Sequence, residues 1–268
     1  MINEVLSLLL FITSTSSYPT VIIHGILSDV NEVLPVEKWL IANNINSTIR
    51  IEIGNGVYDS IFMNMNTQLD VLCNTIYSIN DLQYGFNVIA LSQGGLLARG
   101  YVEKCNKFPV KTLITWATPH EGVDGLGFLD VNFDNIYSEF EQEYLSFSGY
   151  WKDPSKYQEY LDKAQYLPFM NNEIHHSNSE FYKNNFISLK YFIMIWSATD
   201  GVIRPFTSCK FGFFKDLYDS DQYKFDLIGL KTLDLSGRLH IHEVACSHMD
   251  FKDGCFEALK NITIPYLV

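Results

Sequence analysis

The chain has 268 residues, of which 47% are hydrophobic and 15% aromatic, and its formal net charge is −12. This composition is ample for the core of one α/β domain with an inserted lid. The acidic charge argues against binding to a nucleic-acid backbone and indicates a soluble protein with neutral or cationic partners; solubility alone is the simpler explanation of the charge.

The first residues have the pattern of a secretory signal peptide. Residues 5–12 form a short apolar run, and residues 13–17 are small. The run is too short to span a bilayer, and no other segment is apolar enough to do so. Glu4 stands where a signal peptide usually has Lys or Arg, so a buried first strand or helix is the alternative. We expect residues 1–17 to be a signal peptide and residues 18–268 to enter the secretory pathway as one domain, with a lysosomal or secreted destination.

Strand and helix patterns alternate through the first half of the chain. The expected strands are residues 20–23, 48–53, 86–91 and 110–116, and the expected helices are residues 36–42, 61–79 and a segment after the third strand that reaches about Cys105. This alternation predicts right-handed crossovers and a mostly parallel central sheet flanked by helices.

The third strand runs directly into a serine surrounded by small residues. The segment Ala90-Leu91-Ser92-Gln93-Gly94 is close to the G-x-S-x-G elbow, a tight strand-to-helix turn that lifts a serine hydroxyl to the top of a parallel sheet. Small neighbours are needed because larger side chains would collide across the turn. The positive end of the following helix suits a developing oxyanion. A glycine-rich turn without chemistry is the alternative.

The pattern changes after the fourth strand. Residues 121 to about 187 lack strand runs and are rich in Tyr, Phe, Asn and Glu, so we expect a mostly helical lid insertion over the strand ends. Strands resume at residues 189–196 and 239–244, and the alternation in the last one suggests an edge position. Residues 203–230 read as irregular, and residues 250–260 as a closing helix.

Three residue types that acyl transfer requires follow three of these strands. Ser92, Asp200 and His248 come in the order serine, acid, histidine, each just beyond a strand end. A nucleophilic serine needs a base to take its proton, and the base needs an acid to fix its tautomer. The same order along the chain is typical of doubly wound hydrolases. The sequence therefore predicts a catalytic triad.

Other side chains could take two of these roles. The alternatives are Asp226 and Asp234 for the acid, and His120, His175, His176, His240 and His242 for the base. Neither alternative acid follows a convincing strand, and two of the histidines lie within the last strand. His120 follows a strand but comes before any acid in the expected order.

Two backbone amides should stabilise an oxyanion at this site. One belongs to Gln93, the residue after the nucleophile. The other should come from the loop after the first strand, where His24-Gly25 places an amide near Ile26. An ordinary turn is the alternative reading of this loop.

The five cysteines are informative if the chain is secreted. They are Cys73, Cys105, Cys209, Cys246 and Cys255, an odd number that leaves at least one free or paired outside the chain. None lies in a C-x-x-C motif, so a zinc site is not expected, and we expect no metal or cofactor. Asn46 and Asn261 are candidate N-glycosylation sites because each begins an N-x-T or N-x-S tripeptide.

The chain resembles the palmitoyl-protein thioesterase family of α/β-hydrolases from about Pro19 to the C-terminus. The segments that carry the resemblance are His24-Gly25, Glu52-Ile53-Gly54, Asn66-Thr67-Gln68, Tyr84-Gly85-Phe86-Asn87, Ser92-Gln93-Gly94-Gly95, Glu121-Gly122-Val123-Asp124-Gly125-Leu126, Trp151-Lys152-Asp153-Pro154, Phe211-Gly212-Phe213-Phe214 and Ile228-Gly229-Leu230-Lys231. Together these segments are far more specific than the elbow alone.

The resemblance implies the α/β-hydrolase fold and assigns Ser92, Asp200 and His248 to the family triad. It also implies a disulfide between Cys73 and Cys105, which join the helices before and after the elbow strand. Ala90 departs from the family's glycine, which concerns the geometry of the turn. The other three cysteines match no family position, and their state stays open.

The expected activity is that of a serine thioesterase that removes long acyl chains, such as palmitoyl groups, from cysteines. Its expected partners are S-acylated proteins or peptides, or acyl-CoA-like thioesters, and no nucleic acid. A lipid oxyester hydrolase on the same fold is one alternative. A non-catalytic acyl-chain carrier is another. The sequence leaves the oligomeric state open.

Overall fold

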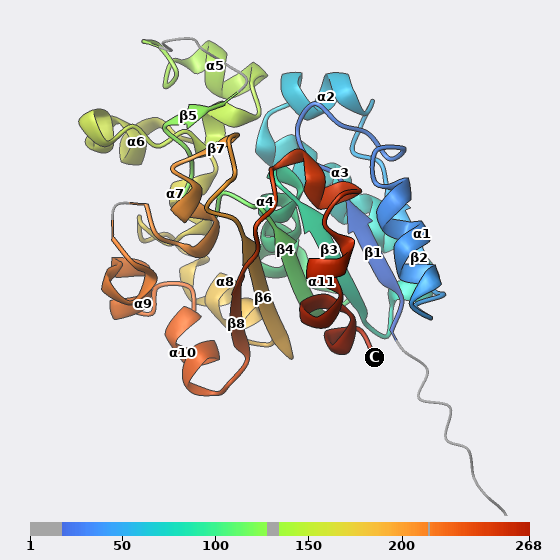
Figure 1. Ribbon diagram of the computed structural model, residues 1–268. Helices are drawn as coiled ribbons and strands as arrows, with labels where there is room; N and C mark the ends of the chain where they lie inside the picture. The colour runs from blue at the N-terminus through green and yellow to red at the C-terminus, as the bar shows by residue number, and fades with distance from the viewer. Residues whose placement is uncertain (1–17, 128–133, 214) are drawn as a thin grey trace, which may run out of the picture.

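The computed structural model describes residues 18–127, 134–213 and 215–268. The expected signal peptide, residues 1–17, lies outside the described residues. Figure 1 shows a central sheet with helices on both faces and a group of shorter helices at one side.

Six parallel strands form the central sheet, in the order β2-β1-β3-β4-β6-β8. The strands are β1 (Thr20–Ile23), β2 (Thr48–Ile51), β3 (Phe86–Leu91), β4 (Val110–Trp116), β6 (Tyr191–Trp196) and β8 (Leu239–Glu243). The expected parallel sheet is confirmed, as is the edge position of the last strand. Because all six strands are parallel, their carboxyl ends meet at one edge of the sheet.

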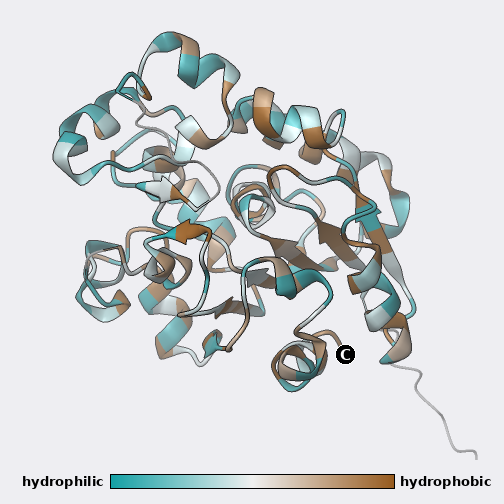
Figure 2. Ribbon diagram, turned by 45° about the horizontal axis from the view of Figure 1, so that its top comes forward, coloured by the Kyte–Doolittle hydropathy of each residue, from teal (hydrophilic) through white to brown (hydrophobic). Residues whose placement is uncertain are grey.

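Two apolar layers, one on each face of the sheet, bury its strands on both sides. On one face, alternate strand residues such as Ile22, Ile89 and Ile114 pack with α1 (Leu34–Ala42) and α11 (Phe256–Thr263). On the other face, residues such as Val88 pack with helices of the opposite layer. These are α3 (Met65–Ser78), α4 (Gln93–Gly100), the π-helical turn η2 (Tyr101–Cys105) and α8 (Ser179–Phe186). Figure 2 shows the hydrophobic strands in the middle of the molecule, between the two layers of helices.

Two expected helices are each divided in the structure. The segment 61–79 contains the end of α2 (Val57–Phe62) and all of α3, because Met63 is extended and the Asn64 side chain accepts a hydrogen bond from the Thr67 amide at 3.0 Å, which caps α3. The segment 250–260 contains the 3₁₀ turn η7 (Met249–Lys252) and the start of α11. The single-helix expectation was wrong in both places.

The segment between β4 and β6 is mostly helical in its described part. It contains β5 (Gly125–Leu126), α5 (Glu139–Tyr144), η3 (Phe147–Tyr150), η4 (Pro154–Lys156), α6 (Tyr157–Lys163), α7 (Leu167–Met170) and α8. The two residues of β5 pair antiparallel with β7 (Ile203–Arg204), a small strand that the sequence did not predict. The expected boundaries of a lid at residues 121 and 187 stay a prediction.

Short elements also occur in the segment that read as irregular. They are η5 (Phe206–Lys210), η6 (Leu217–Asp219) and α9 (Asp221–Lys224), followed by α10 (Leu230–Leu235). The last 3₁₀ turn, η8 (Ile264–Tyr266), follows α11, and η1 (Asn80–Leu82) follows α3.

Candidate active site

Ser92 occupies a strained turn between β3 and α4. Its φ is 52° and its ψ is −128°, a conformation that non-glycine residues rarely adopt. A side chain at Gly94 would collide with the His24 carbonyl, and one at Gly25 would lie 3.0 Å from the Ser92 Cβ. Ala90 lies in β3 without a positive φ, so its methyl group is compatible with the turn. The sequence therefore builds the elbow that the motif predicts.

The fold brings the three predicted catalytic side chains together. His248 Nε2 lies 3.1 Å from Ser92 Oγ, and His248 Nδ1 lies 2.7 Å from Asp200 Oδ2. With Nδ1–H donating to the carboxylate, Nε2 is free to accept the serine proton. The chain of hydrogen bonds runs from acid to histidine to serine.

Asp200 is held in place from its other oxygen. Oδ1 accepts hydrogen bonds from the Val202 amide at 2.8 Å and from the Ile203 amide at 3.0 Å. The Asp200 side chain is 0% exposed. These bonds fix the carboxylate before any substrate binds, which is what an orienting acid requires.

The alternative acids are engaged elsewhere. Asp226 accepts from the Thr232 hydroxyl and pairs with Lys183, and Asp234 accepts from the Tyr223 hydroxyl. Neither contacts a histidine.

The alternative histidines are also accounted for. His120 is buried, lies 2.9 Å from the Thr115 hydroxyl and stacks on Phe211, and burial holds its pKa well below the usual range. His240 and His242 lie in β8, where burial lowers the pKa of both. His176 lies 3.2 Å from the Phe169 carbonyl, and His175 lies beside it in the insertion.

Two predicted backbone donors border the nucleophile. Gln93 is the first residue of α4, and Ile26 lines the same cavity as Ser92. No protein acceptor for the amide of either residue is recorded among the described residues. Both amides are thus available to a ligand oxygen.

Several contacts that the sequence did not reveal hold this region. The Gln93 side chain donates to the Ser60 carbonyl at 2.8 Å and accepts from the Tyr150 hydroxyl at 2.9 Å, which ties α4 to α2 and to the insertion. His24 Nδ1 donates to the Gly25 carbonyl at 3.0 Å, and its Nε2 lies 2.8 Å from Glu52. The segments His24-Gly25, Glu52-Ile53-Gly54 and Ser92-Gln93 of the family resemblance contain these residues, but they did not reveal the contacts.

A cavity of about 350 Å³ opens beside the nucleophile. Its walls are mainly apolar, and its lining residues are Gly25, Ile26, Leu27, Ser28, Glu32, Leu91, Ser92, Trp116, Ala117, Val202, His248, Met249, Phe251 and Lys252. Such a space suits an apolar group presented to the serine. No described residue of the insertion lines it.

The structure holds two disulfides. Cys73 on α3 is bonded to Cys105 at the end of η2, as the family resemblance implied. Cys246 is bonded to Cys255, and the loop between them contains His248. Cys209 is a buried free thiol, and burial raises its pKa well above the usual value, so it is poorly suited to be a nucleophile.

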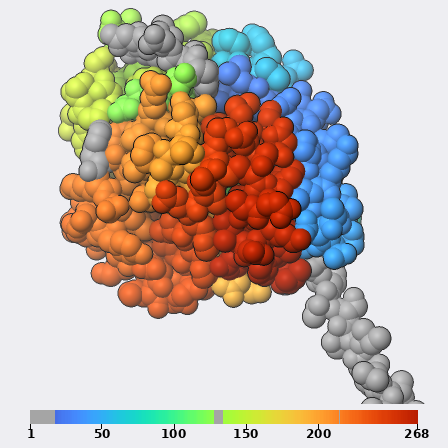
Figure 3. All heavy atoms as spheres, viewed as in Figure 1, coloured from blue at the N-terminus to red at the C-terminus, as the bar shows by residue number. Residues whose placement is uncertain are grey.

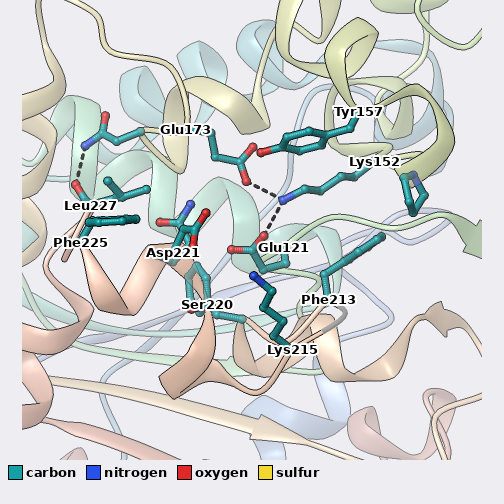
Figure 4. Close-up of a pocket in the computed structure, with 14 residues that line it drawn as sticks. Glu121, Lys152, Tyr157, Glu173, Phe213, Lys215, Ser220, Asp221, Phe225 and Leu227 are labelled. Atoms are coloured by element: carbon teal, nitrogen blue, oxygen red, sulfur yellow. Dashed lines mark hydrogen bonds and ion pairs between the residues drawn. The ribbon is translucent and has the colours of Figure 1, made fainter.

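Figure 4 shows a second pocket, of about 590 Å³, lined by residues of the insertion and of the segment 211–227. Lys152 Nζ lies 2.6 Å from Glu121 and 2.5 Å from Glu173, and all three side chains are largely buried. Burial raises the pKa of Glu121 to about 7, against the opposing effect of Lys152. None of the three triad residues lines this pocket. Its ion pairs join the first residue of the insertion, Glu121, to later parts of the same insertion.

The candidate glycosylation sites are accessible. Asn46 lies in the turn before β2, and Asn261 lies on α11; both are exposed. Among the described residues, no group of three or more His, Cys, Asp or Glu side chains is arranged to hold a metal ion.

Comparison with known proteins places this geometry in context. The model of the palmitoyl protein thioesterase family matches residues 19–248. The chain is 33% identical to palmitoyl-protein thioesterase 3 of Dictyostelium discoideum, in an alignment that covers 94% of this chain and 93% of that protein. It is 31% identical to the lysosomal thioesterase PPT2 homologue of Drosophila melanogaster, over 85% of this chain and 86% of that protein.

Solved structures with a similar fold include esterases and lipases. A carboxylesterase from Nitrososphaera gargenis has a TM-score of 0.52 and 14% identity, covering 94% of this chain and 90% of that one. The mature Bacillus licheniformis lipase BlEst2 has a TM-score of 0.51 and 13% identity, covering 95% and 94%. These likenesses confirm the expected α/β-hydrolase fold.

Proposed function

The chain belongs to the palmitoyl protein thioesterase family, and on that premise we propose that it is a serine hydrolase that cleaves the thioester between a long acyl chain and a cysteine of a protein or peptide. The observation that carries the proposal is the unbroken chain of hydrogen bonds from Asp200 through His248 to Ser92. Ser92 is the nucleophile, His248 the base and Asp200 the acid that orients the base.

Acylation would begin with attack of Ser92 Oγ on the thioester carbonyl carbon while His248 Nε2 takes the serine proton. The carbonyl oxygen becomes an oxyanion, and the amides of Ile26 and Gln93 donate hydrogen bonds to it. Collapse of the intermediate breaks the carbon–sulfur bond. The departing sulfur receives the proton from His248, and the acyl group remains as an ester on Ser92.

Deacylation would use water in place of the serine. His248 takes a proton from a water molecule, whose oxygen attacks the acyl ester, and the same two amides stabilise the second oxyanion. Breakage of the carbon–oxygen bond returns the proton to Ser92 Oγ and releases the fatty acid. No step draws on a metal or an organic cofactor.

The leaving group supports a thioester as the substrate. A cysteine thiol has a pKa near 8.5, so a thiolate leaves with little help, whereas an alkoxide needs a proton from His248 in the same step. The residues that line the cavity offer no second buried acid beside the triad, since Glu32 is exposed and pairs with Lys252. The site therefore matches thioester cleavage, which needs less proton donation to the leaving group than oxyester cleavage does.

A comparison of matched substrates tests this function. We expect kcat/KM for a palmitoyl thioester, divided by the uncatalysed hydrolysis rate, to equal or exceed the corrected value for the palmitoyl oxyester, and Ser92→Ala to abolish both. A corrected ratio that strongly favours the oxyester would instead identify a lipid oxyester hydrolase. No hydrolysis of either substrate by folded protein would favour an acyl-chain carrier.

We also propose that the protein acts within the secretory pathway, in the lysosome. The support is the pattern of residues 1–17 and the likeness to relatives named lysosomal thioesterases. Among the described residues, no helix is long and apolar enough to cross a membrane. Glycosidase treatment of protein from a eukaryotic host should reduce its mass through loss of glycans at Asn46 or Asn261.

We infer that residues 18–268 form one domain, with residues 121–187 as an insertion that covers part of the strand ends. Tyr150 supports this because its hydroxyl binds the Gln93 side chain beside the nucleophile.

A further inference from the structure

Large apolar side chains are exposed at the catalytic cavity and on two helices that are linked to its wall by hydrogen bonds. Leu27 and Met249 line the cavity and are themselves exposed. The neighbouring helices α2 and α5 add further exposed rings and aliphatic groups. We call this set the apolar rim; its members are Leu27, Val57, Tyr58, Phe62, Phe140, Tyr144 and Met249.

Hydrogen bonds join the parts of the apolar rim into one surface. The Leu27 amide donates to the Ser60 hydroxyl of α2 at 3.0 Å. The Ser146 amide, two residues beyond α5, donates to the Ile61 carbonyl at the end of α2 at 2.8 Å. Figures 1 and 3 show α2 and α5 at the same end of the molecule. Because Ser60 also binds the Gln93 side chain, this surface is fixed relative to the nucleophile.

Two aromatic pairs dominate the apolar rim. The rings of Tyr58 and Phe62 lie 4.9 Å apart on α2, and those of Phe140 and Tyr144 lie 5.0 Å apart on α5. Each pair is spaced by four residues, so both rings share one helix face. Tyr58 is 61% exposed and Phe140 is 66% exposed. Contiguous exposed rings of this kind mark an interaction surface, whereas single exposed rings do not.

The charges beside these rings are negative. The sequence of α5 is EFEQEY, with three carboxylates and no lysine or arginine, and α2 carries Asp59. A surface rich in anionic lipid would be repelled. A choline headgroup presents a quaternary ammonium outward, which suits tyrosine rings through cation–π contact and suits neighbouring carboxylates.

We propose that the apolar rim docks the protein on a zwitterionic lipid surface of the phosphatidylcholine type. This inference rests on the proposed function, because a peptide that carries a long acyl chain holds that chain in lipid. Docking would place the mouth of the cavity against the lipid, so that the acyl chain reaches Ser92 without crossing water. The phenylalanine rings enter the acyl region, and the tyrosine rings stay at the headgroup level.

Vesicle flotation tests the docking without catalysis. The Ser92→Ala protein should bind phosphatidylcholine vesicles, and adding Tyr58→Ser and Phe62→Ser should weaken binding by about tenfold or more. The matched control is Tyr218→Ser with Phe225→Ser, which removes the same ring types from exposed positions near α9, which lies at the lower left of Figure 1, away from α2 and α5. The control should bind like the parent.

Several outcomes would overturn the proposal. They are absence of vesicle binding by the Ser92→Ala protein, equal losses in the rim variant and the control, and stronger binding to vesicles that also contain phosphatidylserine. Sedimentation velocity that shows a dimer lost only in the rim variant would assign the surface to a second copy of the chain.

A water-soluble short-chain thioester separates this proposal from the proposed function. The Tyr58→Ser, Phe62→Ser protein with Ser92 intact should hydrolyse it at the wild-type rate, because neither ring lines the catalytic cavity. If the wild-type protein binds vesicles but hydrolyses no thioester, the proposed function fails. If it hydrolyses the soluble thioester but does not bind vesicles, the docking fails.

Discussion

Asp200 receives three hydrogen bonds, two from backbone amides and one from His248. A carboxylate held this firmly selects the histidine tautomer that leaves Nε2 facing Ser92. An asparagine at this position keeps the shape but can present its amide NH₂ to Nδ1, which favours the opposite tautomer.

We therefore predict that Asp200→Asn lowers kcat toward a soluble thioester by about 10⁴-fold with little change in thermal stability. Asp234→Asn is the control, since within the described part of the chain this carboxylate accepts a hydrogen bond only from the Tyr223 hydroxyl. It should keep nearly full activity. A large loss in Asp234→Asn with activity retained in Asp200→Asn would show that the wrong acid has been assigned.

Glu103 makes the stability of the fold depend on pH. The side chain is fully buried beside Arg99, and burial raises its pKa from 4.5 to about 8, against the opposing effect of Arg99. The folded chain therefore holds this proton more tightly than the unfolded chain does. Its stabilising contribution is complete below pH 4.5 and is lost as the pH rises through about 8.

We predict that the free energy of unfolding falls as the pH rises, by up to about 1.4 kcal/mol per pH unit for this one group. Glu103→Gln should remove the part of this pH dependence that comes from Glu103. The change should be clearest between pH 7 and 8, because burial raises the pKa of Glu121 only to about 7 and that of Glu103 to about 8. Urea titrations across this range measure the slope, with the exposed Glu257→Gln as control. Equal slopes in both variants would contradict the assignment.

The role of a single residue could be predicted from the sequence where that residue directly follows a recognisable strand. Ser92, Asp200 and His248 each follow a strand with a clear apolar pattern, so their convergence could be inferred from topology. The supports at Tyr150 and His24 were not predictable as contacts, because their partners lie 57 and 28 positions away along the chain and no periodic pattern links them.

At the scale of elements, the two disulfides have different consequences. Cys73–Cys105 closes the longer loop and joins two helices of the core layer, whereas Cys246–Cys255 closes a short loop that carries His248. In the chain-entropy model the first contributes about 3–4 kcal/mol and the second about 2–3 kcal/mol. Only the second constrains a catalytic side chain directly.

We predict that Cys73→Ser with Cys105→Ser lowers the free energy of unfolding by about 3–4 kcal/mol and leaves kcat of the remaining folded protein nearly unchanged. Cys246→Ser with Cys255→Ser should cost less stability but lower kcat, because the His248 loop gains freedom. Urea unfolding and kcat, measured on both double variants, separate the two effects. The opposite pattern would remove the positioning role of the second disulfide.

The division between α2 and α3 shows where periodicity misleads. Apolar residues continue at helical spacing through the break, from Ile61 to Met65, so the pattern predicts one helix. The capping bond from the Asn64 side chain to the Thr67 amide is local and does not disturb that spacing. An asparagine before a helix start was the available signal. The break matters because it leaves α2 a separate helix, whose Ser60 hydroxyl accepts a hydrogen bond from the amide of Leu27 in the cavity wall.

For the whole molecule, the sequence predicts the class of fold better than its arrangement. Strand and helix alternation was enough to expect a parallel sheet. The neighbour order β2-β1-β3-β4-β6-β8 could not be derived, because pairing between distant strands depends on crossovers rather than on local pattern. The pairing of β5 with β7 joins distant parts of the chain, and no local pattern indicates it. The Cys246–Cys255 bond depends on the local geometry of its loop, which composition does not encode.

The most direct test of the whole account is to locate the acyl group on the enzyme during turnover. Wild-type protein mixed with an S-palmitoyl peptide is quenched in acid within the first turnover, digested and mapped by mass spectrometry. We predict palmitate in ester linkage to Ser92 and equimolar free thiol on the peptide, with neither formed by Ser92→Ala. Release of palmitate by Ser92→Ala at the wild-type rate, or an acyl group on another residue that turns over, would contradict the account.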